Sequence, residues 1–143
     1  MGNDKIKQFV IENQIRELSS LAEKIDDLAD EWKLPPAMAM NMNLVIEEAV
    51  SNIIFYAFAN NGRHEIGISI SLTNSLLTIK ITDDGAPFNP LAQERPDITL
   101  PAEERPVGGL GIFLISQIMD KMDYARIKNE NILTLTKSIY DEH

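Results

Sequence analysis

Apolar residues three and four positions apart predict a first helix that begins after residue 13. Asn13 is a candidate N-cap, and the pair Pro35-Pro36 ends the helix because proline cannot continue it. Such a stripe usually packs on a sheet, so we expect it to be buried. A seam for a partner protein is the less favoured interpretation. The stripe consists of Ile15, Leu18, Leu21, Ile25, Leu28 and Trp32.

The same spacing predicts two further helices. One runs from about Ala37 to Phe58, and because residues 44–58 are apolar nearly all round, we expect that part to lie in the core. The other runs from Gly109 to Met122. Its residues expected to face inward are Ile112, Ile115, Ile118 and Met119.

Segments rich in β-branched residues predict strands. Two of them form a hairpin through the turn Thr73-Asn74-Ser75, and two more form a closing hairpin through Asn129-Glu130-Asn131. The predicted strands are residues 5–11, 65–72, 76–82, 124–128 and 132–139.

The predicted order is strand, two helices, two strands, loop, helix and two strands. Helices grouped between hairpins predict an α+β fold, a two-layer sandwich with the helices packed on one face of a mixed, largely antiparallel sheet. The strand–helix alternation of a doubly wound parallel sheet is missing, and so is a G-x-x-x-x-G-K-[ST] phosphate loop. The length of 143 residues, without a break in composition, predicts a single domain covering residues 1–143.

Residues 87–107 form the predicted lid. Five of the seven prolines lie between Pro87 and Pro106, and this segment has neither helical nor strand periodicity. A stretch of about twenty such residues inside a compact domain is usually a lid, a binding loop or a disordered segment.

Composition narrows the range of partners. The net charge of −9 argues against direct binding to nucleic acid or to an anionic membrane. No apolar stretch is long enough for a membrane span, no signal peptide is recognisable, and the absence of cysteine excludes disulfides and thiolate metal sites. These features fit a cytoplasmic protein. A polyphosphate ligand would need positive potential from backbone N–H groups, a helix N-terminus and a divalent cation.

Glu48 and Asn52 place an acid and an amide one turn apart within the apolar second helix. A buried carboxylate needs a partner, a metal or a shifted pKa, and an amide oxygen is a ligand suited to Mg²⁺. The carboxylate could also accept a proton from an attacking hydroxyl group. The alternative is structural: Glu48 reaches solvent, and Asn52 satisfies backbone groups.

Two glycine-containing segments complete the candidate chemistry. Asp83, followed by Gly85, ends a predicted strand, where a carboxylate could accept a hydrogen bond from an exocyclic amine; a simple Asp-Gly turn is the alternative. Residues 108–111 (GGLG) open the last helix, whose N-terminus suits phosphate, or they form a hinge for the lid. Arg105 precedes this turn and could reach a terminal phosphate, or be an ordinary exposed arginine.

Together these segments resemble the GHKL superfamily of ATP-binding domains, which includes histidine kinases, gyrase-type ATPases and MutL-type proteins. The chain looks most like the bacterial anti-sigma factor serine/threonine kinases. Residues 48–52 (EAVSN) match their N-box, residues 83–88 (DDGAPF) the first glycine box, and residues 109–112 (GLGI) the second. Pro87 stands where many superfamily members carry a second glycine. The resemblance implies the Bergerat-type ATP-binding fold.

The resemblance also implies a role for each matched residue. Asn52 would ligate a Mg²⁺ that bridges the ATP phosphates, and Glu48 would be the general base for a serine or threonine hydroxyl. Asp83 would bind the adenine amine, with Gly85 beside it. The remaining residues would form the phosphate site under the lid: Arg105, Gly109, Leu110 and Gly111.

From the family, the expected function is an ATP-dependent serine/threonine protein kinase acting as an anti-sigma factor. Its expected partners are a STAS-domain antagonist, which it phosphorylates, a sigma factor and a second copy of the chain. The alternative is a non-catalytic ATP-binding module that sequesters a transcription factor. A bare ATPase of a larger assembly is a third interpretation, but the sequence offers no transducer region.

Overall fold

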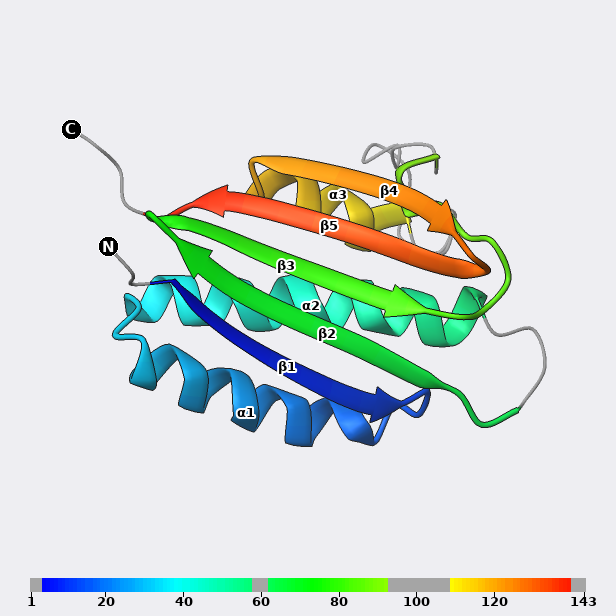
Figure 1. The fold of residues 1–143 in the computed structure, drawn as a ribbon, viewed down its shortest axis with the longest axis horizontal. Coiled ribbons are helices and arrows are strands. Elements are labelled where there is room, and N and C mark those ends of the chain that lie inside the picture. Colours follow the sequence, from blue (N-terminus) through cyan, green and yellow to red (C-terminus); the bar gives the residue numbers. More distant parts are fainter. Residues whose placement is uncertain (1–3, 58–61, 93–108, 140–143) are drawn as a thin grey trace.

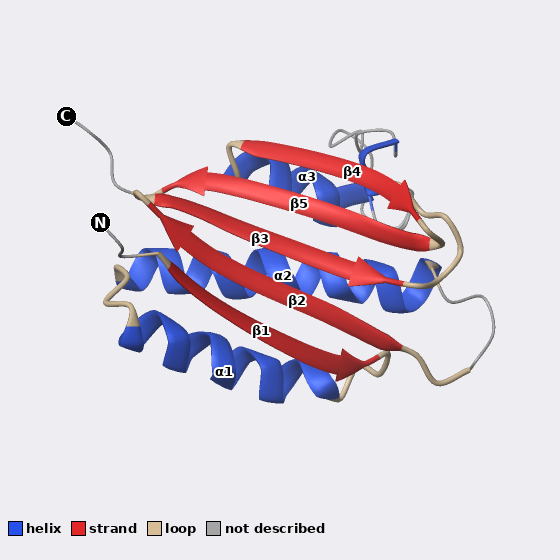
Figure 2. Ribbon diagram, in the orientation of Figure 1, coloured by secondary structure: helices blue, strands red, loops and turns tan. Residues whose placement is uncertain are grey.

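A five-stranded antiparallel sheet carries three helices on one face (Figures 1 and 2). The computed structural model describes residues 4–57, 62–92 and 109–139, without the side chains of Ala92, Gly109 and Leu110. The elements are β1 (Lys5–Glu12), α1 (Glu17–Glu31), α2 (Pro36–Tyr56), β2 (Glu65–Thr73), β3 (Leu76–Asp83), the short 3₁₀ helix η1 (Pro90–Ala92), α3 (Gly109–Ile118), β4 (Lys121–Ile127) and β5 (Glu130–Ser138).

The strand order is β1-β2-β3-β5-β4, and each neighbouring pair is antiparallel. The predicted α+β class and element order are therefore confirmed. On the described part of the chain every neighbouring pair in the sheet is antiparallel. Hairpins join β2 to β3 and β4 to β5, and the two helices after β1 lead to its neighbour β2. The connection through α3 instead passes over one position, so that β5 lies between β3 and β4.

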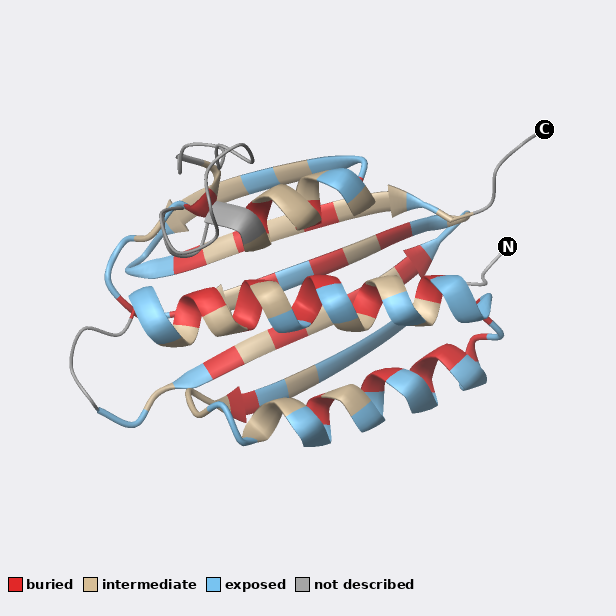
Figure 3. Cartoon of the chain, turned by 180° about the vertical axis from the view of Figure 1, so that it is seen from behind, coloured by how far each residue is buried: buried red, intermediate tan, exposed pale blue. Residues whose placement is uncertain are grey.

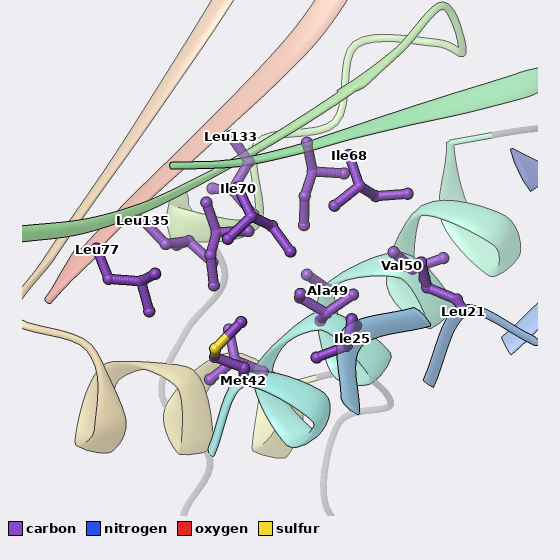
Figure 4. Packing of buried hydrophobic residues seen from close by; sticks show 14 of the residues in the cluster. Leu21, Ile25, Met42, Ala49, Val50, Ile68, Ile70, Leu77, Leu133 and Leu135 are labelled. Atoms are coloured by element: carbon purple, nitrogen blue, oxygen red, sulfur yellow. The ribbon is translucent and has the colours of Figure 1, made fainter. Parts of the chain in front are cut away.

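The core lies between the sheet and the helices, as Figure 4 shows. Alternate residues of β2, β3 and β5 point inward, as period-two strands require, and meet the apolar faces of α1 and α2. The labelled residues of this core are Leu21, Ile25, Met42, Ala49, Val50, Ile68, Ile70, Leu77, Leu133 and Leu135.

The predicted start of α1 was wrong. The helix begins at Glu17, and Asn13 instead ties the end of β1 to the entry of β2: its amide donates to the Gly62 carbonyl (3.1 Å), and its Oδ1 accepts from the His64 N–H (2.9 Å). An asparagine side chain used by another segment cannot cap the helix. Ile15, before the first turn, is 45% exposed, while the later part of the stripe packs inward.

The expectation that residues 44–58 lie in the core was only partly confirmed: α2 ends at Tyr56, residue 58 lies outside the described residues, and only one side of the helix is buried. α2 lies between α1 and α3 across one face of the sheet, so its opposite side faces solvent (Figure 3). Leu44 and Tyr56 are exposed there, and Phe55 is 64% exposed. A helix in the outer layer of two buries only the side that meets the sheet.

The closing hairpin of β4 and β5 differs from its prediction in where β4 begins and in which residues form the turn. α3 ends at Ile118, and β4 begins at Lys121, so Met122 belongs to a strand. The turn consists of Lys128 and Asn129, both with positive φ (51° and 67°), as a two-residue hairpin turn requires. Asn131 therefore lies in β5 rather than in the turn.

Candidate functional site

The structure brings the predicted acid–amide pair against the second glycine segment. A methyl group built on Gly111 would lie 2.6 Å from Glu48 Oε2 and 3.6 Å from Asn52 Nδ2. A side chain at residue 111 would therefore force the end of the Glu48 side chain out of its position. Glu48, Asn52 and Gly111 belong to one site, although 63 positions separate the first from the last.

The first glycine segment packs against the C-terminal end of α2. The Ala86 N–H donates to the Ala57 carbonyl (2.7 Å), and a methyl group on Gly85 would lie 2.5 Å from that same oxygen. This contact satisfies a carbonyl at the helix end. It also fixes the position of Asp83 relative to the helix that carries Asn52.

Asn52 is buried, at 7% exposure, and its Nδ2 has no hydrogen-bond partner among the described residues. Nearly all buried polar atoms in folded proteins are paired, so an unpaired one points to a missing partner such as a ligand. Nδ2 is a hydrogen-bond donor, so its partner would be an acceptor such as a phosphate oxygen, whereas a metal would be held by the Asn52 Oδ1 instead.

Glu48 is half-buried beside this amide. Burial raises the pKa of its carboxyl above the ordinary value, and the charge of neighbouring Glu47 raises it further. A carboxylate with a raised pKa is a better proton acceptor than a fully solvated one, which suits a general base.

Asp83 is 2% exposed at the end of β3. Its Oδ1 accepts hydrogen bonds from the Gly85 N–H (2.8 Å) and from Asn131 Nδ2 (3.0 Å), whereas Oδ2 has no partner among the described residues. Burial raises the pKa of Asp83, and the two hydrogen bonds oppose this rise. The simple turn interpretation accounts for the Gly85 bond only and leaves Oδ2 unexplained.

Asp83 and Asn52 line one small internal cavity of about 10 Å³. This is room for about one water molecule, so a purine ring enters only if neighbouring side chains move. The walls come from α2, β3, β4, β5, α3 and the segment after β3. The lining residues are Ala49, Asn52, Ile53, Ile81, Asp83, Phe88, Pro90, Ile112, Tyr124, Asn131 and Leu133.

Sequence reasoning missed the contribution of the closing hairpin. Asn131 bonds to Ala86 and Phe88 in the segment after β3, and Arg126 donates a hydrogen bond to the Gly85 carbonyl (2.7 Å). The Tyr124 hydroxyl donates to the Asn131 Oδ1. No local pattern marks these residues, because their role depends on the pairing of Asp83 with Asn131 across β3 and β5. Tyr56 is exposed and stacks on Phe88, which lines the cavity.

Several residues predicted to bind the phosphates are not described, or are described by their backbone alone. Arg105 and most of the lid, residues 93–107, lie outside the described residues. Gly109 and Leu110 open α3, but only their backbone is described. Within the described ranges no group of three or more His, Asp or Glu side chains could hold a metal ion. A cation here would have few protein ligands, as Mg²⁺ commonly does.

A larger, open hollow of about 770 Å³ lies on the face of the sheet that the helices leave uncovered. Five acidic residues line it against one arginine, Arg63: Glu12, Glu65, Asp83, Asp84 and Glu130. These charges repel a triphosphate, so the hollow does not compete with the small cavity as a nucleotide site. In the described residues no helix is long and apolar enough to cross a membrane.

The fold and the site together define a nucleotide-binding α+β domain, with an acid–amide pair on a central helix facing two glycine segments. Residues 11–137 match the histidine kinase-like ATPase domain family, and the chain belongs to that family.

Named relatives lie within the same family. The chain is 28% identical over 109 residues to the serine/threonine-protein kinase BtrW of Bordetella bronchiseptica, covering 76% of this chain and 75% of BtrW. It is 32% identical over 106 residues to the serine-protein kinase RsbW of Bacillus thuringiensis, covering 71% of this chain and 65% of RsbW. The chain thus spans a little under two thirds of the length of RsbW.

Solved structures support the fold. The RsbU and RsbW domains of a Mycobacterium tuberculosis protein superpose with a TM-score of 0.67 at 12% identity, over 94% of this chain and 32% of that one. A histidine kinase domain from Erythrobacter litoralis gives a TM-score of 0.53 at 15% identity, over 87% and 60%.

Proposed function

We propose that the chain is an ATP-dependent serine/threonine protein kinase that acts as an anti-sigma factor and phosphorylates a STAS-domain antagonist protein. The observation that carries this proposal is the contact of Gly111 with Glu48 and Asn52, which puts an acid and an unpaired amide at the N-terminal end of α3. The named relatives BtrW and RsbW, both protein kinases, support the same activity. A kinase of this kind uses the ATP of the cytoplasm.

Each element supplies one part of the reaction. Asp83 receives the exocyclic amine of adenine, with Gly85 beside the base, and Asn52 binds the Mg²⁺ that neutralises the phosphates. The backbone N–H groups of Gly109, Leu110 and Gly111 face the phosphates, where the helix dipole favours negative charge. Arg105, outside the described residues, approaches the γ-phosphate.

Glu48 accepts the proton of the incoming serine or threonine hydroxyl as its oxygen attacks the γ-phosphorus. The bond from phosphorus to the β,γ-bridging oxygen breaks, and ADP leaves. Phosphoryl transfer of this kind depends mainly on positioning and charge stabilisation. The bound Mg²⁺ would supply much of that stabilisation, while the protein's own contribution is to hold the acid, the amide and the glycine turn together.

Two substitutions on one helix separate binding from transfer. Asn52→Ala should abolish Mg²⁺-dependent ATP binding, whereas Glu48→Ala should bind ATP normally and lose transfer by roughly a hundredfold or more. Binding is measured by calorimetry, and transfer by radiolabel from ATP to a co-encoded STAS protein. Glu47→Ala, an exposed acid next to Glu48, is the matched control and should retain both activities.

Three results would count against the proposal. Equal ATP binding by the wild type and Asn52→Ala would remove the metal assignment. Full transfer by Glu48→Ala would remove the base. A tight complex with the partner proteins but no transfer by the wild type would favour the non-catalytic module that sequesters a transcription factor. A second copy of the chain and a sigma factor stay predicted partners.

A further inference from the structure

Asn131 sits directly opposite Asp83 in the pairing of β3 with β5 and connects the carboxylate to its surroundings. Its Nδ2 donates to Asp83 Oδ1 (3.0 Å) and to the Ala86 carbonyl (2.9 Å). Its Oδ1 accepts from the Phe88 N–H (3.1 Å) and from the Tyr124 hydroxyl. At 4% exposure, the amide is buried with both of its polar atoms paired.

The four partners fix the orientation of this amide. If the Asn131 amide were flipped so that Oδ1 and Nδ2 exchanged places, its N–H groups would point at the Phe88 N–H. Its oxygen would point at the Asp83 carboxylate and the Ala86 carbonyl. Donors would then face a donor, and acceptors would face acceptors, inside a region of low dielectric where such contacts are costly. The nitrogen of Asn131 therefore faces Asp83.

This orientation makes the two oxygens of Asp83 unequal. Oδ1 receives two N–H donors, from Gly85 and Asn131, whereas Oδ2 is buried and has no partner among the described residues. The carboxyl plane is held by the bonds at Oδ1. Oδ2 is then the atom left to accept a hydrogen bond from a ligand that enters the cavity that Asp83 lines.

We propose that Asn131 is a positioning residue for the nucleotide base: it holds Asp83 as a hydrogen-bond acceptor and thereby selects a purine that carries an exocyclic amine. This inference rests on the proposed ATP site. A 6-oxo purine such as hypoxanthine would place a carbonyl oxygen against Oδ2 and be repelled. Selection thus depends on Asp83 staying ionised with Oδ2 free.

Electrostatics explain why a positioning residue is needed. Burial raises the pKa of Asp83, and nearby Asp84 raises it further, whereas the hydrogen bonds from Asn131 and Gly85 and the charge of Arg126 lower it. A protonated Oδ2 would be a donor and could not accept the amine N–H. Asn131 is the side chain that opposes this protonation by direct hydrogen bonding.

The same amide also holds the chain that follows Asp83. The bonds to the Ala86 carbonyl and from the Phe88 N–H keep residues 86–88 against β5, and the Phe88 ring stacks on Tyr56 with the ring centres 5.8 Å apart. The Asn131 side chain thus holds both the Asp83 carboxylate and residues 86–88, of which Phe88 lines the cavity, in position.

The informative variant is Asn131→Asp, which keeps the size of the side chain and its Oδ1 but replaces the donor group by an oxygen. Binding of ATP and of inosine triphosphate, both with Mg²⁺, is measured by calorimetry at about pH 8 and about pH 6. At the higher pH we expect ATP affinity to fall roughly 10–100-fold, as losing hydrogen bonds to a charged group predicts. The preference for ATP over inosine triphosphate should fall with it.

The pH profile separates positioning from simple loss of structure. At about pH 6 the introduced carboxyl can share a proton with Asp83 and donate it to Oδ1, so part of the ATP affinity of Asn131→Asp should return. The wild type, whose Asp83 keeps its hydrogen bonds from Asn131 and Gly85, should show no such recovery on acidification. Asn129→Asp is the matched control: it makes the same change at an exposed position of the neighbouring turn, so it should keep both the ATP affinity and the preference for ATP.

Melting curves establish that each variant folds. If Asn131→Asp does not, Asn131→Ser, which keeps a small polar group on β5, should lose the preference for ATP without recovery at low pH. A folded variant with the affinity, preference and pH profile of the wild type would overturn the role of Asn131. A wild type that binds ATP and inosine triphosphate equally would overturn it as well, whereas a wild type that binds neither would show that the proposed function itself is wrong.

Discussion

Among the described residues, three buried side-chain atoms have no hydrogen-bond partner, Asn43 Oδ1, Asn52 Nδ2 and Asp83 Oδ2, and the residues Asn52 and Asp83 line the same cavity. Leaving a buried polar group unpaired costs about 1–3 kcal/mol, and more for a charged one. A core built for stability alone would hold apolar side chains at both positions. These two residues are therefore best explained by a ligand that supplies the missing partners.

Replacing Asp83 by asparagine should weaken ATP binding but not lower the stability of the folded protein. Asp83→Asn removes a buried charge while Oδ1 can still accept from Gly85 and Asn131, so the Tm of the nucleotide-free protein at neutral pH should not fall and is expected to rise. The amide presents a donor in place of Oδ2, so ATP affinity should fall roughly 10–100-fold. Asp84→Asn, at the exposed neighbour, is the control and should bind ATP as the wild type does.

The pH dependence of this effect has a definite sign. Because the folded-state pKa of Asp83 is raised, its ionised form destabilises the fold at neutral pH, and the penalty is relieved as pH falls through that raised value. The difference in unfolding free energy between Asp83→Asn and the wild type should therefore shrink on acidification. Urea titrations across this range measure it, and a difference that grows at low pH would contradict the assignment.

Among the elements, α2 is the one that both glycine segments contact. The two contacts differ in which atoms of α2 or its C-terminal end a methyl group added to the glycine would meet. Opposite Gly111 lies the free end of the Glu48 side chain, which can move. Opposite Gly85 lies the backbone of Ala57, which cannot move without shifting the helix end. The same change from glycine to alanine should thus have different consequences at the two positions.

Gly111→Ala should leave the Tm within a few degrees of the wild type but reduce phosphoryl transfer at least tenfold, since Glu48 must turn away from its position. Gly85→Ala should instead cost about 1–3 kcal/mol of unfolding free energy. Gly67→Ala is the matched control, because its nearest neighbour to an added methyl is the Thr82 carbonyl at 4.0 Å. Thermal melts and radiolabel transfer check all three, and full activity in Gly111→Ala would contradict the proposed place of Glu48.

At the scale of the whole molecule, an acidic chain with net charge −9 is proposed to bind a highly negative ligand. The acid-lined hollow on the uncovered face of the sheet increases the unfavourable potential. Binding must then depend on local donors, the N-terminus of α3 and a divalent cation, rather than on the overall field. This arrangement makes affinity depend strongly on Mg²⁺.

Mg-ATP should consequently stabilise the folded protein far more than ATP with a chelator. At about a hundredfold excess over the dissociation constant, linkage adds about 2.7 kcal/mol to the free energy of unfolding. For a chain of this size that corresponds to a rise in Tm of roughly 5–10 °C. Asn52→Ala should lose the Mg²⁺-dependent part of the shift, and an unchanged melting curve of the wild type in Mg-ATP would argue against the nucleotide site.

The fold was predictable from the sequence because its signals are local. The stripe from Leu18 to Trp32 and the alternation in residues 65–82 each identify an element by its own period. The errors occurred where distant residues decide. Asn13 bonds with Gly62 and His64 instead of capping α1, and the exposure of Phe55 follows from the position of α2 in the outer layer.

The sequence by itself determined the element order, the α+β class and the short segments that carry acids, amides and glycines, since these depend on neighbours a few positions apart. Only the tertiary structure decided that Gly111 meets Glu48 and that Asn131 lies opposite Asp83, 48 residues away. Strand register and helix packing set these distances through the burial of the whole core. No local pattern in a sequence encodes them, and so the residue that positions Asp83 emerged only from the folded chain.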